Sequence, residues 1–227
     1  MAISRAQAAS APPGVRAGRV IPNPIAVGDW PLRTRKDGYV LWIGRMAEVK
    51  GPHRAIAAAR YADVPLVLAG PIQPGQEDFF DAEIAPQVDA RRVAYVGEVK
   101  GRAKQELFAR ARAVLMPIRW AEPFGMVMIE ALACGTPVIS FPEGAATEIV
   151  LHGHNGFLAA DEREMASAIR RVGAIDPRAC RDSVARRYDA PAVAAEYESL
   201  YRWTAAQAAG PSHLSLEPSV GAAVRGD

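Results

Sequence analysis

The sequence predicts an α/β fold in which a doubly wound parallel sheet is covered by helices on both faces. Short, continuous apolar runs alternate with segments of helical periodicity, as expected for strands buried on both sides. Glycine or proline closes the first four of these runs. The chain has 227 residues, 50% apolar and 23% charged, which suits one large globular domain with short additional segments.

The apolar runs define the expected strands. The first has the sequence YVLWI and ends at Gly44, and the second has the sequence PLVLA and ends at Gly70-Pro71. The expected strands are residues 39–43, 65–69, 93–96, 113–116 and 138–141, with a short sixth strand at 156–159. Strands of this kind bind ligands at their carboxyl ends, so the loops that follow them become the candidate site.

Helices are expected between the strands. Gly51-Pro52 opens the first, because proline is tolerated in the first helical turn. Cys134-Gly135, with Pro137 just beyond, ends another helix. Asp161 and Glu164 resemble a capping box. The expected helices are residues 52–62, 76–88, 102–111 and 126–134, one beginning after Asp161 and one after Asp189.

This alternation divides the chain into three parts. Residues 1–37 lack it, contain several prolines and are expected to be a linker region. Residues 38–206 form the expected α/β domain. Residues 207–227 are rich in Ser, Pro, Gly and Ala, and a flexible tail is expected there.

Composition and charge exclude several classes of function. Lys and Arg number 27 against 25 Asp and Glu, so the net charge of +2 provides no basic field for nucleic acid. No apolar run approaches the roughly 18 residues that span a bilayer, and the N-terminus lacks the apolar region of a signal peptide. Arg170-Arg171 and Arg186-Arg187 favour solvated helix faces over a membrane surface. The two cysteines, Cys134 and Cys180, form no disulfide framework, and a cytoplasmic protein is expected.

The segment 122–138 combines carboxylates with an expected helix N-terminus. Glu122 and Glu130 are eight residues apart, about 12 Å along one helix. The intervening Pro123-Phe124-Gly125 loop lets Glu122 fold back over the helix start, where free N–H groups bind phosphate and a carboxylate accepts sugar hydroxyls. On spacing alone, a surface position for Glu122 and a solvated helix position for Glu130 explain the pattern better.

A second segment carries two cations between glycines, at residues 44–51. Arg45 can bind a phosphate with two N–H groups, and Lys50 adds a point charge beside it. The pattern of a Walker loop is absent. The alternative is a solvated turn in which Arg45 or Lys50 pairs with Glu48.

Three weaker signals stay open. His152 and His154 with Glu148 nearby are a conceivable metal site, but the segment is more simply a loop, and no metal is expected. Trp120 either lines the candidate cleft or packs in the core. The two cysteines are interpreted as plain thiols rather than nucleophiles.

Six segments recur together in one known family. They are GRMAEVKG (44–51), LAG (68–70), VGEVKGRAK (96–104), EPFGMVMIEALACGTPVI (122–139), GAATE (144–148) and GHNGFL (153–158). The E-x7-E pattern followed by A-x-x-x-G-T-P-V is the most specific of them. The chain resembles, over about residues 20–203, the donor-binding domain of the retaining family 4 glycosyltransferases. The resemblance implies a Rossmann-like domain, the C-terminal half of a GT-B architecture.

The resemblance implies a role for each matching residue. Arg45 and Lys50 match the pair that holds the donor diphosphate. Val99 matches the position whose backbone meets the nucleobase, and Lys104 lies near it. Glu130 matches the carboxylate that binds the ribose hydroxyls.

The catalytic candidate implied by the resemblance is Glu122, which matches the carboxylate beside the donor sugar. Backbone groups of Phe124, Gly125 and Met126 match those that touch sugar hydroxyls and phosphate, and Val127 continues this donor-binding stretch. The family transfers a hexose from a nucleoside diphosphate sugar with retention of anomeric configuration and without a metal or other cofactor. Its positively charged groups stabilise the leaving diphosphate.

The resemblance also implies partners. Family members carry an N-terminal domain that binds the acceptor, and here residues 2–7 resemble only its closing strand and turn. Residues 19–25 (RVIPNPI) resemble the interdomain linker, with Pro24 in place of the usual glycine. The expected partners are the nucleotide sugar, an unknown acceptor, and an N-terminal domain or partner chain. A non-catalytic nucleotide-sugar-binding module is the alternative, and an epimerase or phosphorylase of the same architecture is a third.

Overall fold

The structure is a computed structural model, and it describes residues 1–208. The flexible tail expected at 207–227 lies outside the described residues from position 209 onward.

Six strands form one sheet in the order β3-β2-β1-β4-β5-β6, and every neighbouring pair is parallel. The strands are β1 Val40–Ile43, β2 Leu66–Ala69, β3 Val93–Tyr95, β4 Ala113–Met116, β5 Val138–Ser140 and β6 Gly156–Leu158. The predicted doubly wound sheet is therefore confirmed, including its short sixth strand. The chain builds outward from β1 to β3 and then returns to β4, so the switch in strand order lies between β1 and β4.

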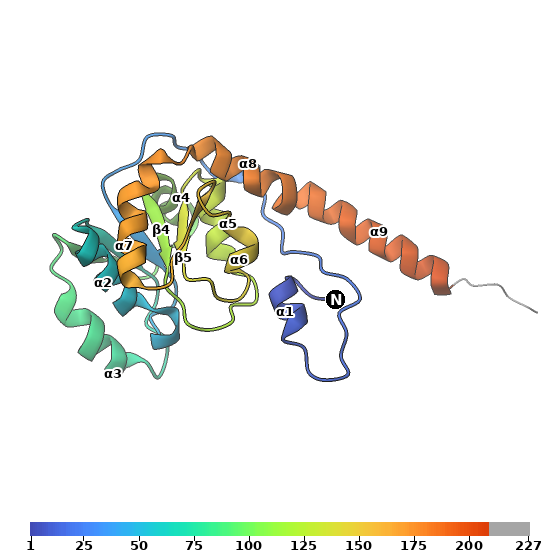
Figure 1. The fold of residues 1–227 in the computed structure, drawn as a ribbon, viewed down its shortest axis with the longest axis horizontal. Coiled ribbons are helices and arrows are strands. Elements are labelled where there is room, and N and C mark those ends of the chain that lie inside the picture. Colours follow the sequence, from blue (N-terminus) through green and yellow to red (C-terminus); the bar gives the residue numbers. More distant parts are fainter. Residues whose placement is uncertain (209–227) are drawn as a thin grey trace, which may run out of the picture.

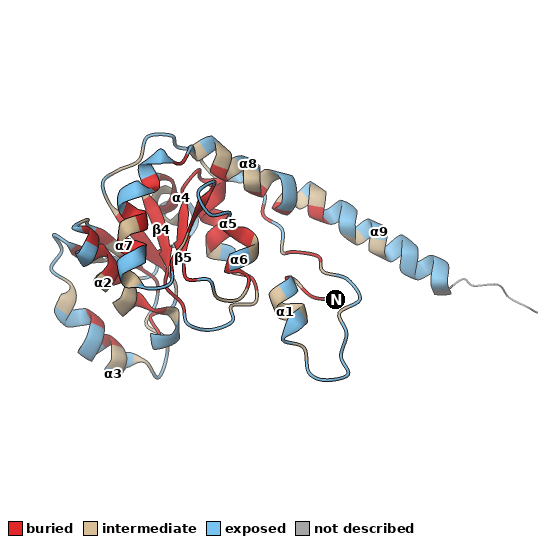
Figure 2. Ribbon diagram, in the orientation of Figure 1, coloured by how far each residue is buried: buried red, intermediate tan, exposed pale blue. Residues whose placement is uncertain are grey.

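Helices cover both faces of this sheet (Figure 1). α2 packs against α7 and α5 against α8, and the two pairs lie on opposite sides of the strands. The helices are α1 Arg5–Ala9, α2 Pro52–Ala62, α3 Glu77–Phe79, α4 Gly101–Arg110, α5 Met126–Ala133, α6 Ala146–Ile149, α7 Glu162–Arg171, α8 Pro177–Tyr188 and α9 Ala190–Ala208. Figure 2 shows the burial concentrated in the strands and in the helix faces turned toward them.

Four stretches differ from the sequence prediction. Residues 2–7 were expected as a strand and turn, but a helix, α1, begins at Arg5, and the short helix α6 was not expected either. The helix expected at 76–88 is short and irregular: α3 continues into a π-helix at Phe80–Ile84 and a 3-10 turn at Ala85–Gln87. Pro86 explains this, because it lacks an N–H and its ring cannot follow a regular helix. The helix α8 was not expected. Its start nevertheless follows a known pattern: Asp176 is the N-cap and accepts a 2.9 Å hydrogen bond from Arg178 N, and Pro177 is the first helical residue.

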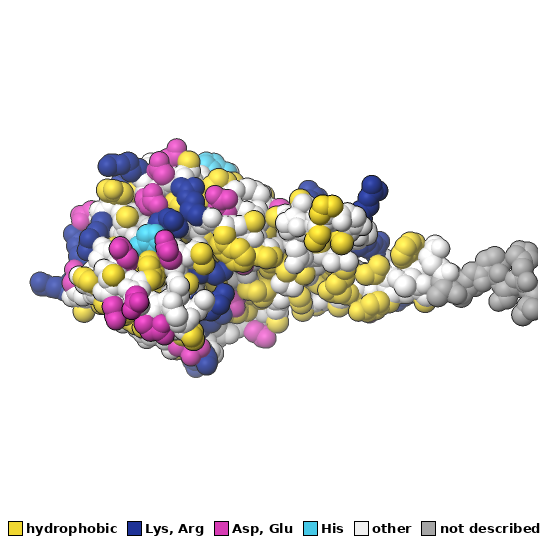
Figure 3. Space-filling view, turned by 90° about the horizontal axis from the view of Figure 1, so that it is seen from below, with side chains coloured by type: hydrophobic (Ala, Val, Ile, Leu, Met, Phe, Trp, Pro, Cys, Tyr) yellow, Lys and Arg dark blue, Asp and Glu magenta, His cyan; other side chains and the backbone are white. Residues whose placement is uncertain are grey.

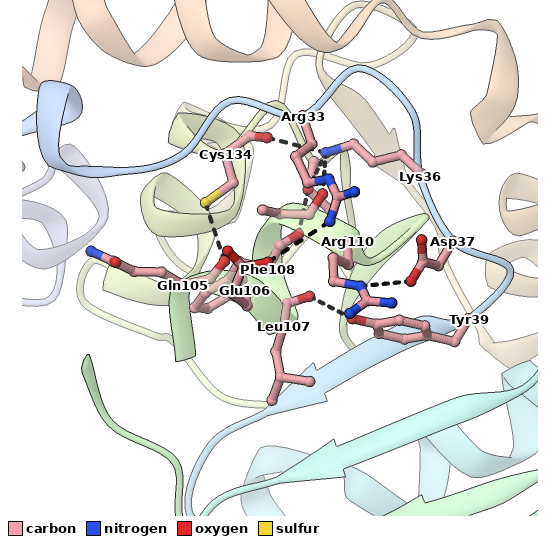
Figure 4. Close-up of polar contacts among 12 residues, drawn as sticks. Arg33, Lys36, Asp37, Tyr39, Gln105, Glu106, Leu107, Phe108, Arg110 and Cys134 are labelled. Atoms are coloured by element: carbon pink, nitrogen blue, oxygen red, sulfur yellow. Dashed lines mark hydrogen bonds and ion pairs between the residues drawn. The ribbon is translucent and has the colours of Figure 1, made fainter. Parts of the chain in front are cut away.

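Residues 1–37 pack against the domain. Ile21, Ile25 and Val27 are buried. Lys36 Nζ donates to Ala109 O, Cys134 O and Thr136 Oγ1 at 2.9, 3.1 and 2.7 Å, which satisfies carbonyls at the ends of α4 and α5. Figure 4 shows this region, where Arg110 also pairs with Asp37 and the Tyr39 hydroxyl donates to Leu107 O.

Burial of the two thiols predicts a loss of stability at high pH. Burial raises the pKa of Cys134 and of Cys180 from 9.0 to about 12. The unfolded chain therefore releases these protons first, and each thiol lowers the free energy of unfolding by up to about 1.4 kcal/mol per pH unit above pH 9. Burial lowers the pKa of Lys36 to about 8, which acts in the opposite direction between pH 8 and 10.5.

The thiol contribution is isolated by comparison with a variant. Urea unfolding at pH 8, 9, 10 and 10.5 is expected to show that the protein loses stability relative to a Cys134→Ala, Cys180→Ala variant as pH rises above 9. Parallel pH profiles for the two proteins would contradict this, because Lys36 is common to both.

The last helix, α9, projects from the body as a long arm (Figure 1). Its outer half is exposed, and Tyr201 and Trp203 are among the exposed aromatic residues. Apolar side chains continue from the body along this arm (Figure 3). No helix among residues 1–208 combines the length and apolar character needed to cross a membrane.

Candidate functional site

The switch point of the sheet brings together two residues far apart in sequence. Lys50 lies after β1, Glu122 lies after β4, and Lys50 Nζ is 2.5 Å from Glu122 Oε2. Their side chains are only 18% and 15% exposed, so the pair is largely removed from water. Lys50 therefore pairs across the cleft rather than with Glu48. A parallel sheet binds its ligands at this location.

Close approach of two loops holds Lys50 in this position. Gly51, at φ 72°, is the N-cap of α2, and a Cβ there would lie 2.4 Å from Pro117 O, so only glycine fits. Trp42 Nε1 donates to Lys50 O at 3.1 Å. The backbone of the lysine is thus fixed from β1 and from the end of β4, which leaves its ammonium directed at Glu122.

A second lysine–carboxylate pair joins α4 and α5. Lys104 Nζ of α4 is 2.7 Å from Glu130 Oε1 of α5. Glu130 is 8% exposed, so it is not a solvated helix position. Its Oε2 is buried and has no hydrogen-bond partner among the described residues. A buried carboxylate oxygen without a donor is costly, and a ligand hydroxyl would satisfy it.

The N-terminus of α5 lies between the two pairs. The helix begins after Gly125, whose φ of 87° is left-handed, and no side chain caps it. Its first N–H groups therefore have no intrahelical acceptor and carry the positive end of the helix dipole. A cavity of about 110 Å³ opens beside it, lined by Lys50, Glu122, Gly125, Met126, Val127 and five residues of β1 and β4 and the turns that follow them. Such a helix start binds anions.

The other predicted site residues occupy different surroundings. The Phe124 side chain is buried and packs edge-on against Tyr188, so only its backbone faces the site. Arg45 is exposed and forms no side-chain hydrogen bond or ion pair within residues 1–208. Val99 is half-buried against the edge of the core, in the loop before α4.

Trp120 contacts one of the cleft residues, Lys50. Lys50 Nζ is 4.7 Å from the centre of its ring, within the range of a cation–π contact. The residue is 39% exposed, so Trp120 lies at the surface beside Lys50 rather than packing in the core.

Sequence reasoning missed the residues that support Glu122. Ala145 N donates to Glu122 O at 2.9 Å, and a Cβ at Gly144 would lie 2.4 Å from the same oxygen. Ser4 and Glu148 also contact this region. Gly144, the glycine of the GAATE segment, was the one feature of the local sequence that pointed to this close contact with Glu122. No three His, Cys, Asp or Glu side chains of the described part of the chain gather as a metal site.

Comparison with known proteins identifies the family. Residues 31–179 match the sequence model described as Glycosyl transferases group 1. The chain belongs to this family. It is 32% identical over 171 residues to the glycogen synthase of Mycobacterium tuberculosis (strain CDC 1551 / Oshkosh), covering 70% of this chain and 41% of that protein.

Solved structures agree with this family. AviGT4, a glycosyltransferase involved in avilamycin A biosynthesis, has a TM-score of 0.75 and 29% identity, covering 91% of this chain and 63% of that one. Anabaena Alr3699/HepE, solved in complex with UDP-glucose, has a TM-score of 0.75 and 25% identity, covering 90% and 63%. The Rossmann-like, GT-B fold class is thereby confirmed. The chain spans about two fifths of the length of the glycogen synthase and under two thirds of both structures.

Proposed function

We propose that this glycosyltransferase chain binds a nucleoside diphosphate hexose in the cleft between β1 and β4. The observation that carries the proposal is the Lys50–Glu122 pair beside the uncapped N-terminus of α5. Cationic side chain, helix dipole and carboxylate converge there on one cavity, which provides donors for a diphosphate and an acceptor for sugar hydroxyls. The bound UDP-glucose of Alr3699/HepE supports a uridine nucleotide.

The nucleoside half of the donor is assigned to the second pair. The free Oε2 of Glu130 accepts from a ribose hydroxyl, and Lys104 orients that carboxylate through its other oxygen. The backbone at Val99 meets the base. Arg45 is exposed at the rim and closes on the diphosphate when the donor enters.

The proposed reaction is hexosyl transfer with retention of anomeric configuration, as in family 4. The bond between the sugar anomeric carbon and the diphosphate oxygen breaks, and its electron pair leaves with the diphosphate. Lys50, Arg45 and the α5 dipole stabilise that charge, so no metal ion is required. The acceptor hydroxyl attacks from the same face and passes its proton to the departing phosphate oxygen. Glu122 lies beside the sugar and stabilises the positive charge that develops on it.

Transfer is proposed for the chain together with an acceptor-binding part, because whole glycosyltransferases of this kind extend well beyond the region matched here. Binding of the donor is proposed for the chain itself. A module that binds the nucleotide sugar without turning it over is the second candidate.

Calorimetric titration with the UDP, GDP and ADP forms of glucose, in EDTA, tests the donor site. One nucleotide class is expected to bind, and Glu130→Gln is expected to weaken it by about 10- to 100-fold, because the ribose loses a charged acceptor. Glu106→Gln is the matched control and should bind normally. Glu106 also lies on a helix, α4, but its exposed carboxylate pairs with Arg33, away from the cleft.

Three outcomes would count against the proposal. They are failure of all three donors to bind, equal losses in Glu130→Gln and Glu106→Gln, and binding that requires added Mg²⁺. Supplying an acceptor-binding domain of a relative then separates transferase from binding module by the appearance of free nucleoside diphosphate.

A further inference from the structure

The loop that carries Glu122 is also bound by the N-terminal end of the chain. Ser4 Oγ donates to Pro123 O at 2.5 Å, across 119 residues of sequence. Ser4 is 4% exposed, and its hydroxyl also accepts from Gln7 N at 2.9 Å as the N-cap of α1. A hydroxyl has a single proton, so Ser4 uses its only donor on the carbonyl next to Glu122.

Glu148 fixes the same segment from the domain side. Its two carboxylate oxygens accept from Arg5 N at 3.1 Å and Ala6 N at 2.8 Å, the free N–H groups of the first turn of α1. Two charge-assisted hydrogen bonds at the positive end of a helix set both its position and its direction. A five-residue helix does not persist alone in water, so these contacts keep α1 in place.

The loop at 122–125 is thereby held through two consecutive carbonyls. Glu122 O accepts from Ala145 N, and Pro123 O accepts from Ser4. The buried ring of Phe124 anchors the next residue. Between these anchors the Glu122 side chain is directed to Lys50, so its direction depends on all three.

We propose that Ser4 is a positioning residue of the donor site and that Glu148 acts through it by holding α1. The proposal rests on the proposed function, because it concerns the same site. Ser4 keeps the 122–125 loop in the geometry that presents Glu122 and the α5 N-terminus to the diphosphate and hexose. It does not contact the Lys104–Glu130 pair, so the nucleoside half of the site is independent of it.

Calorimetry with two ligands tests this division. The ligands are the donor that binds the unaltered protein and the matching nucleoside monophosphate. Ser4→Ala is expected to weaken the donor by about tenfold, by loss of a hydrogen bond to the loop, and to leave the monophosphate within twofold. Ser4→Thr, which retains the hydroxyl, is expected to restore donor binding.

Ser10→Ala is the matched control, because Ser10 ends α1 and its exposed hydroxyl donates only to Gln7 O. It should bind both ligands normally. Glu148→Gln, which keeps its shape and loses its charge, should weaken the donor in the same selective way, and it replaces Ser4→Ala if that variant does not fold.

Two results would overturn the proposal. In the first, Ser4→Ala lowers the unfolding midpoint but leaves donor affinity unchanged; Ser4 is then structural only, and the proposed function stands. In the second, both ligands weaken equally, which indicates a general loosening of the domain. Failure of the unaltered protein to bind any donor would instead reject the proposed function itself.

Discussion

Replacement of Lys50 with alanine is expected to weaken binding of the nucleoside diphosphate hexose by about 100-fold, equivalent to about 2.8 kcal/mol. Two effects add in the same direction. The diphosphate loses the ammonium that lines the same cavity as the α5 N-terminus. Glu122, whose side chain is 15% exposed, loses its partner at 2.5 Å and then repels the incoming anion.

The second effect can be separated from the first. A Lys50→Ala, Glu122→Gln double variant removes the repulsion, so it is expected to bind the donor more tightly than Lys50→Ala alone. Coupling of this kind is expected for side chains in direct contact. Equal affinities for the single and double variants would show that the charge of Glu122 does not repel the bound diphosphate.

Arg60→Ala is the control for net charge, because Arg60 lies on the exposed face of α2, near its far end. It lowers the charge of the protein by the same amount without touching the cleft. Titration at 0.05 and 0.5 M salt should leave the large difference between the two variants in place, since a largely buried pair is screened little. Similar losses in both variants would reduce the role of Lys50 to general electrostatic attraction.

Local sequence was sufficient for most of the sheet. Each expected strand lies within one residue of the observed bounds, because a strand buried on both faces must be continuously apolar and must stop where glycine or proline turns the chain. α8 was missed because its buried residues, Cys180, Val184 and Tyr188, are outnumbered by charged neighbours. Its Asp176 cap was present in the sequence as a start signal.

The site was predictable in part. The loop after β1 and the E-x7-E segment had to meet once β1 and β4 became neighbours, which the strand order requires. The pairing of Lys104 with Glu130 was not predictable, since 26 residues and the strand β4 separate them in sequence. The contacts of Ser4 and Glu148 depend on where residues 1–37 fold back onto the domain, and no periodic pattern in the sequence predicts that position.

The backbone of Gly70 packs directly against the loop that carries Lys50. Gly70, at φ 133°, lies just after β2, and its N–H donates to Gly97 O at 2.7 Å while its carbonyl accepts from the Tyr95 hydroxyl at 2.8 Å. Both its N–H group and its carbonyl are therefore held by hydrogen bonds. A Cβ at this position would lie 1.8 Å from Gly44 O, the residue that opens the loop carrying Arg45 and Lys50.

Gly70→Ala is accordingly expected to lower the free energy of unfolding by about 4 kcal/mol or more, or to prevent folding. The clash is with backbone, so no side-chain rotation relieves it, and Gly44 must move away from β2. Gly75→Ala is the matched control: it lies in the same loop at φ 81° but has no atom within 4 Å of its added Cβ, so only the left-handed strain of about 1–2 kcal/mol applies. Urea unfolding followed by circular dichroism measures both. Equal losses in the two variants would mean that the loop after β1 yields freely, and the precise seating of Lys50 would then not depend on this contact.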